Sequence, residues 1–166
     1  MNMKTENLNY SFDEQNYTTF VAYPENDGAP LVLIAHAWGG RDNFVEEKAI
    51  ELAKEGFVAM AVDMYGDGKQ GTTIEENQSL MTPLVEDRKK LKSIINAALE
   101  QGKNLEGVDS SKIAAIGYCF GGMVVLDLAR SGADVRGVVS FHGLLMDSEI
   151  SKQGIKSKIL VLHGER

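Results

Sequence analysis

The single cysteine of this 166-residue chain, Cys119, stands in a sequence that could make it a nucleophile. It lies in Gly117-Tyr118-Cys119-Phe120-Gly121-Gly122, between an apolar run at residues 113–116 and an apolar helical segment at residues 120–130. Small residues two positions before and after the cysteine allow a sharp, strained turn from strand to helix. Such a turn exposes the thiol at a helix N-terminus, where the positive end of the helix dipole favours the thiolate. The pattern therefore predicts nucleophilic catalysis by Cys119.

Two backbone N–H groups are expected to bind the oxygen of a carbonyl that Cys119 attacks. One belongs to Phe120, directly after the nucleophile, and the other to Trp38, in the loop His36-Ala37-Trp38-Gly39-Gly40. The two glycines of that loop let its backbone approach a ligand closely. Each donor of such an oxyanion hole typically contributes about 2.7 to 4 kcal/mol in the transition state.

The elements that must position these residues alternate between short apolar runs and amphipathic segments. Runs that are apolar throughout and separated by helices are typical of a parallel sheet with helices on both faces. The N-terminal part instead alternates apolar and polar residues, which predicts an antiparallel hairpin. The hairpin strands are expected at 8–12 and 17–23, the parallel strands at 31–35, 57–62, 113–116, 135–141 and 159–162, and the helices at 43–56, 82–102 and 120–130. Asn43 and Thr82 are the expected N-caps of the first two helices.

Length and composition restrict the class of protein. The length predicts a single domain, 1–166. A net charge of −7 without a basic stripe argues against nucleic-acid binding, and no apolar stretch is long enough for a membrane span. A lone cysteine cannot form an internal disulfide. We expect a soluble, cytoplasmic protein.

Residues 108–122, ending in the cysteine-centred turn, resemble the nucleophile segment of the dienelactone hydrolase family. Residues 33–40, 61–66 and 138–143 also resemble this family, and the similarity extends from about residue 17 to the last residue. The resemblance implies an α/β-hydrolase fold and hydrolysis of a small carboxylic ester or lactone. It further implies a thioester acyl-enzyme and a Cys, His and Asp triad, with no metal and no organic cofactor. His36, Tyr65 and His142 are the residues expected to line the substrate pocket.

Three features depart from the family's pattern. Ala37 stands where the best-known members have a glutamate that contacts the cysteine, and Asp67 stands near the position of their substrate-binding arginine. The acid of the triad is expected one position after Arg166 and the histidine further on. This predicts a C-terminally incomplete domain without the last strand and helix, with little or no turnover by itself and with self-association through an uncovered sheet edge.

Several alternatives stay open on the sequence. The chain could be a non-catalytic module that keeps only the fold, or a thiol-redox protein that uses an activated Cys119. Cys119 could also be a buried, inert residue. His36 and His142 could be hydrogen-bonded structural residues at strand ends, as is expected for His163.

Overall fold

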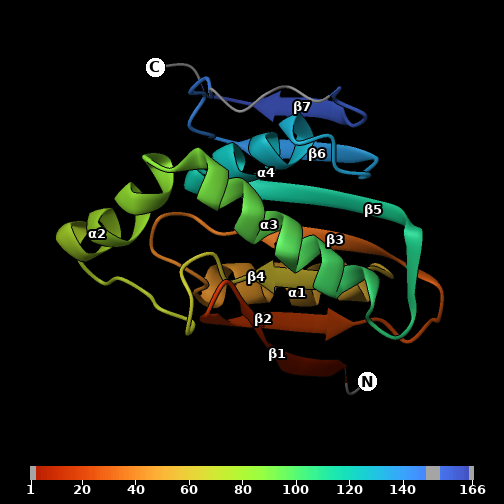
Figure 1. Cartoon of the computed structure of the whole chain (residues 1–166). Coiled ribbons are helices and arrows are strands. Elements are labelled where there is room, and N and C mark those ends of the chain that lie inside the picture. Colours follow the sequence, from red (N-terminus) through yellow and green to blue (C-terminus); the bar gives the residue numbers. More distant parts are fainter. Residues whose placement is uncertain (1–2, 149–153, 165–166) are drawn as a thin grey trace.

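In the computed structural model, which describes residues 3–148 and 154–164, a seven-stranded sheet carries four helices (Figure 1). The strands follow one another in the order β1-β2-β4-β3-β5-β6-β7 across the sheet. Their bounds are β1 Lys4–Phe12, β2 Gln15–Tyr23, β3 Ala29–Ala35, β4 Val58–Val62, β5 Val108–Tyr118, β6 Gly137–Phe141 and β7 Lys158–Leu162. The helices are α1 Asn43–Lys54, α2 Ile74–Val85, α3 Arg88–Lys103 and α4 Phe120–Arg130.

The sheet is parallel except at the N-terminal edge. β1 pairs antiparallel with β2, and β2 pairs antiparallel with β4, whereas β4, β3, β5, β6 and β7 run parallel. Asp13 and Glu14 connect β1 to β2 with φ angles of 49° and 62°. Two successive residues with positive φ match the twist of a tight hairpin. The expected antiparallel hairpin and mostly parallel sheet are therefore confirmed.

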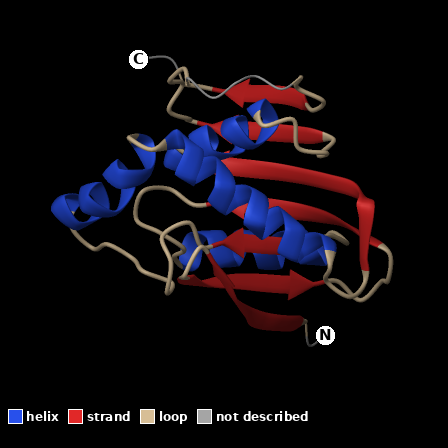
Figure 2. Cartoon of the chain, in the orientation of Figure 1, coloured by secondary structure: helices blue, strands red, loops and turns tan. Residues whose placement is uncertain are grey.

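Helices cover both faces of the sheet, as expected. α3 and α4 cross one face, and α1 lies on the other (Figures 1 and 2). Leu33 and Met60 belong to the core under α3 and α4, while Ile34 and Ala61 belong to the smaller core under α1. Successive strand residues thus enter opposite cores, which explains why the central strands are apolar throughout.

The helix boundaries correct two expectations. α1 begins one residue earlier than expected, because Asp42 and not Asn43 is its N-cap; the Asp42 side chain accepts from the N–H of Val45. The helix expected from Thr82 is in fact two helices. α2 is capped by Thr73, which forms a reciprocal capping box with Glu76, so Thr82 and Pro83 lie inside it.

The second of these helices, α3, starts at an N-cap of its own. The Asp87 side chain accepts from the N–H of Lys90. Gly102 does not end α3, which continues to Lys103. A Cβ at position 102 would lie 2.7 Å from a methyl carbon of Leu31, so this glycine permits close packing of α3 on the sheet.

The last strand is the least covered part of the sheet. All five residues of β7 are exposed, among them Leu160 at 51% and Leu162 at 45%. No helix within residues 3–148 and 154–164 has the length and apolar character needed to cross a membrane.

Candidate active site

Cys119 is the only residue between β5 and α4, which makes the expected sharp turn. Its φ of 56° and ψ of −112° lie outside the regions that non-glycine residues normally occupy. Its N–H donates to the carbonyl of Phe141 at 2.8 Å, and its own carbonyl accepts from Gly122 at 2.9 Å. The thiol is half-buried at the N-cap position of α4. Strain of this kind is maintained only where surrounding structure holds it.

The three glycines around Cys119 each permit a close backbone approach. A Cβ on Gly117 would lie 2.8 Å from the nitrogen of Gly122, and a Cβ on Gly122 would lie 2.6 Å from Cα of Gly143. A Cβ on Gly121 would lie 2.8 Å from the carbonyl oxygen of His36. The glycines thus bring the first turn of α4 against the ends of β3 and β6.

This contact places the loop after β3 beside the turn that holds Cys119. Phe120 begins α4, so its N–H has no acceptor within the helix and is free to bind an anion. Trp38 lies half-buried in the adjoining loop and packs against the core. Both expected oxyanion donors therefore belong to segments that meet next to Cys119.

Asp63 is the first residue after β4, and its carboxylate is completely buried. One oxygen of Asp63 accepts from the N–H groups of Tyr65 and Gly66, both at 3.0 Å. The other accepts from Thr18 at 3.0 Å and from Gly68 at 2.8 Å. Four backbone donors therefore fix the course of the chain after β4.

Tyr65 connects that segment to the expected oxyanion loop, residues 36–40. Its hydroxyl donates to the carbonyl of Trp38 at 2.8 Å, and its ring stacks on Phe120 with centroids 5.8 Å apart. Burial raises the pKa of the Tyr65 hydroxyl, and the nearby Cys119 raises it further. The hydroxyl therefore stays protonated and remains a donor at neutral pH.

The histidines occupy three different environments. His36 is completely buried, and both of its ring nitrogens make hydrogen bonds. It therefore lies behind the site, whereas the sequence predicts a place for it in the pocket wall. His142 is exposed after β6, with a φ of 52° and its N–H bonded to the carbonyl of Leu162. Its ring lies 6.2 Å from that of His163. Within the described residues, no hydrogen bond joins the thiol of Cys119 to a histidine or a carboxylate.

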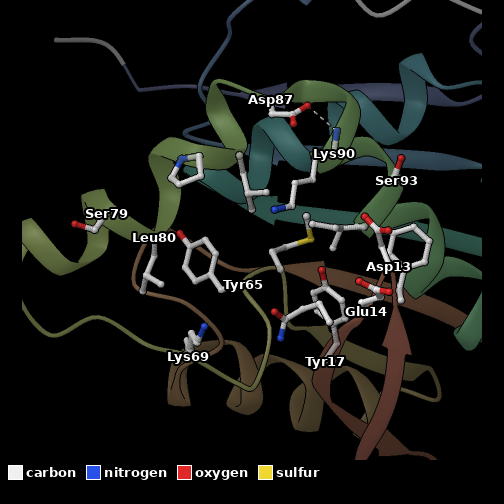
Figure 3. Close-up of a pocket in the computed structure, with 16 residues that line it drawn as sticks. Asp13, Glu14, Tyr17, Tyr65, Lys69, Ser79, Leu80, Asp87, Lys90 and Ser93 are labelled. Carbon is white, nitrogen blue, oxygen red and sulfur yellow. Dashed lines mark hydrogen bonds between the residues drawn. The ribbon is translucent and has the colours of Figure 1, made fainter.

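A cavity of about 570 Å³ lies beside Tyr65 (Figure 3). The hairpin turn, the segment after β4, α2 and the start of α3 all contribute to its wall. Lys69 and Lys90 line it together with Asp13 and Glu14, and none of the four makes an ion pair within the described part of the chain. Of the expected pocket residues, only Tyr65 lines this cavity.

The sequence interpretation missed the cavity and the role of Asp63. The cavity residues come from four separate segments, and no spacing in the sequence connects them. A signal for Asp63 did exist, because an aspartate at a strand end followed by Gly66 and Gly68 is typical of a side chain that binds nearby backbone N–H groups. No cluster of three or more potential metal ligands occurs in residues 3–148 and 154–164.

Known proteins are similar to this chain in sequence and fold. The model of the dienelactone hydrolase family matches residues 17–166. A Bradyrhizobium protein named "Probable 2-oxo-3-(5-oxofuran-2-ylidene)propanoate lactonase" is 32% identical over 117 residues, covering 70% of this chain. The carboxymethylenebutenolidase of Pseudomonas putida is 24% identical over 157 residues, covering 90% of this chain. The crystal structure of a dienelactone hydrolase-like promiscuous phosphotriesterase from metagenomic libraries is 33% identical, with a TM-score of 0.92 over 98% of this chain.

These proteins are longer than the present chain. It spans 46% of the lactonase, 66% of the butenolidase and 69% of the phosphotriesterase.

Proposed function

This chain belongs to the dienelactone hydrolase family, and from that membership we propose that it carries the acylation machinery of a carboxylic ester or lactone hydrolase with Cys119 as nucleophile. The observation that carries the proposal is the strained backbone of Cys119 at the start of α4. A half-buried thiol at a helix N-terminus, beside two backbone donors, is suited to attack on a carbonyl.

In the proposed step, the Cys119 thiolate adds to the carbonyl carbon and forms a C–S bond. The carbonyl electron pair moves to the oxygen, which the N–H groups of Phe120 and Trp38 stabilise. Collapse of this intermediate re-forms the carbonyl and expels the alkoxide, leaving a thioester on Cys119. Hydrolysis of the thioester would need a base, and within the described residues no histidine or carboxylate is hydrogen-bonded to Cys119, so the proposal covers acylation alone.

The proposed substrate is a small molecule whose reacting carbonyl lies at Cys119. The cavity beside Tyr65 is not lined by Cys119, Trp38 or Phe120, so we propose that it holds a part of the substrate away from that carbonyl. The volume of about 570 Å³ is within the range of small-molecule sites. Lys69 and Lys90 offer positive charge to an acidic group of the substrate, whereas Asp13 and Glu14, which also line the cavity, would repel one. We propose no metal and no organic cofactor for the reaction.

The proposal is tested by mass spectrometry of the chain after mixing with p-nitrophenyl acetate, with Cys119→Ala as the control. We expect one acetyl group that persists on Cys119, and release of one equivalent of p-nitrophenolate. Equal acetylation of Cys119→Ala would refute the nucleophile. Failure of the thiol to react with either the ester or iodoacetamide would support the alternative of a buried, inert cysteine.

Phosphotriesters are a second candidate substrate class, favoured by the similarity to the metagenomic phosphotriesterase. Here the thiolate would attack phosphorus, form an S–P bond and expel the phenolate. Incubation with diethyl p-nitrophenyl phosphate should then add a diethylphosphoryl group at Cys119. An unmodified Cys119 in a chain that p-nitrophenyl acetate acetylates would exclude this class.

A thiol-redox role is tested on the same thiol. Oxidation of Cys119 by hydrogen peroxide at the rate of free cysteine or below would argue against it.

A further inference from the structure

The ring of His36 makes two hydrogen bonds that together determine where its proton lies. The backbone N–H of Met64 donates to Nε2 at 3.1 Å, and Nδ1 lies 2.7 Å from the carbonyl oxygen of Ala37. A backbone N–H can only donate, so Nε2 is the acceptor and carries no proton. The neutral ring therefore has its proton on Nδ1, where it donates to Ala37.

The carbonyl of Ala37 belongs to the same peptide group as the N–H of Trp38. In a planar trans peptide the C=O and N–H bonds point in opposite directions. The bond from His36 to the Ala37 oxygen therefore also sets the direction of the Trp38 N–H, away from the histidine. The N–H of Gly40 donates to the same oxygen at 3.1 Å, and the Tyr65 hydroxyl holds the next peptide through the carbonyl of Trp38.

We propose that His36 is a positioning residue of the oxyanion hole. In its Nδ1–H form it orients the peptide whose N–H, that of Trp38, receives the substrate oxygen. The inference rests on the proposed acyl-transfer function and extends it to a residue that does not touch the substrate.

The surroundings of His36 keep this arrangement rigid. Its ring lies 4.8 Å from that of Tyr65 and 6.0 Å from that of Phe120, between centroids. Met64, which supplies the N–H to Nε2, directly follows Asp63 with its four backbone donors. The N–H of Met64 is thus held in place independently of the oxyanion loop. The His36 ring therefore fixes the peptide of Ala37 and Trp38 relative to the segment after β4.

Two substitutions separate the two bonds of the ring. In His36→Gln, the side-chain oxygen can reach the place of Nε2 and accept from Met64, but the donor to Ala37 is lost. In His36→Asn, the side-chain amide nitrogen lies near the place of Nδ1 and can donate to Ala37, but the acceptor for Met64 is lost. Both variants have neutral polar side chains, so they form a matched pair.

The measurement is the rate of acetylation of Cys119 by p-nitrophenyl acetate, compared with the rate of alkylation by iodoacetamide. Alkylation needs the thiolate but develops no oxyanion. Removal of a whole oxyanion donor typically costs about 10²- to 10³-fold. For His36→Gln, where the Trp38 N–H is present but no longer held, we expect acetylation to fall roughly tenfold or more while alkylation stays within about twofold. His36→Asn should keep most of the acetylation rate.

The outcomes discriminate between the inference and its alternatives. Wild-type acetylation rates in His36→Gln, or an equal loss of both reactions in both variants, would overturn the positioning role. A wild-type chain that alkylates but never acetylates would instead contradict the proposed function itself.

A measurement on the wild-type chain decides the case if either variant does not fold. The ¹⁵N shifts of the three histidines should include one neutral ring at pH 7 with its proton on Nδ1. A buried ring protonated on Nε2, or on both nitrogens, could not make the pair of bonds described and would refute the inference.

Discussion

Replacing Gly121 by alanine tests whether the contact between α4 and β3 builds the site. A Cβ at this position would lie 2.6 Å from the carbonyl carbon of Ala35 and 2.8 Å from the carbonyl oxygen of His36. Carbon atoms in favourable contact are about 3.5 to 4.0 Å apart, so the helix and the strand would have to separate by about 1 Å. The atoms that must move are backbone atoms of the segment that leads into the oxyanion loop.

Two effects of opposite sign determine the stability of Gly121→Ala. Alanine is favoured over glycine within a helix by about 0.8 to 1.0 kcal/mol. Overpacking a close contact costs about 1 to 3 kcal/mol, and more where only backbone can yield. We therefore expect the free energy of unfolding to fall by roughly 1 kcal/mol or more.

The effect on acylation should be larger than the effect on stability. A misplacement of about 1 Å can lower a rate about 10²-fold, and here the displaced groups include the peptide that bears the Trp38 N–H. Urea unfolding can be followed by the fluorescence of Trp38, the one tryptophan of the chain, and acylation by release of p-nitrophenolate.

Gly137→Ala is the matched control for this experiment. A Cβ at position 137 would lie 3.6 Å from the oxygen of Lys158, an ordinary contact, and should change neither property. Gly121→Ala with higher stability than wild type and an unchanged acylation rate would refute the reasoning.

Four further changes have defined outcomes. Cys119→Gly should be more stable in urea than Cys119→Ala by about 1 kcal/mol, because glycine relieves the positive φ at some cost in chain entropy; the reverse order would argue against strain. Asp127→Asn should lower the free energy of unfolding by about 3 to 5 kcal/mol, because Asp127 is fully buried in ion pairs with Arg88 and Arg130; an unchanged urea midpoint would contradict this. Burial lowers the pKa of His36 from 6.5, against smaller opposing effects of the Ala37 oxygen and of Asp63 and Asp42, so the unfolded chain binds a proton that the folded chain does not. The free energy of unfolding should accordingly decrease as the pH falls below about 6.5, by at most about 1.4 kcal/mol per pH unit. In urea titrations at several pH values, His36→Gln should remove this contribution to the pH dependence. Leu160→Lys should reduce self-association in sedimentation velocity if the exposed strand β7 mediates it, and a monomeric wild-type chain would refute that expectation.

Patterns confined to a few neighbouring residues were sufficient for most of the fold. The alternation at residues 17–23 predicted β2, and the apolar runs at 31–35 and 159–162 predicted β3 and β7 within two residues. Helix starts were less certain, because competing caps lie close together. Thr73 with Glu76 and Thr82 with Pro83 are both valid N-terminal signals; α2 starts at the first, where the reciprocal capping box forms, and Asp87 caps α3 after Thr82 and Pro83 have been included in α2.

The features of the site likewise fall into those that neighbouring residues predict and those that depend on the fold. The sequence by itself predicted the sharp turn at Cys119 and the glycines that permit it, because this turn is a local structure and its requirements lie in adjacent residues; the same residues carry the proposal that Cys119 is the nucleophile and that Phe120 and Trp38 are oxyanion donors. Only the tertiary structure decided that His36 lies behind the site with its proton on Nδ1, and that Tyr65 joins the oxyanion loop to a cavity built from four segments. The physical reason is that a hydrogen bond or a cavity wall depends on which atoms meet in space, and for residues as far apart in the chain as Phe12 and Ile94 the fold alone sets those distances.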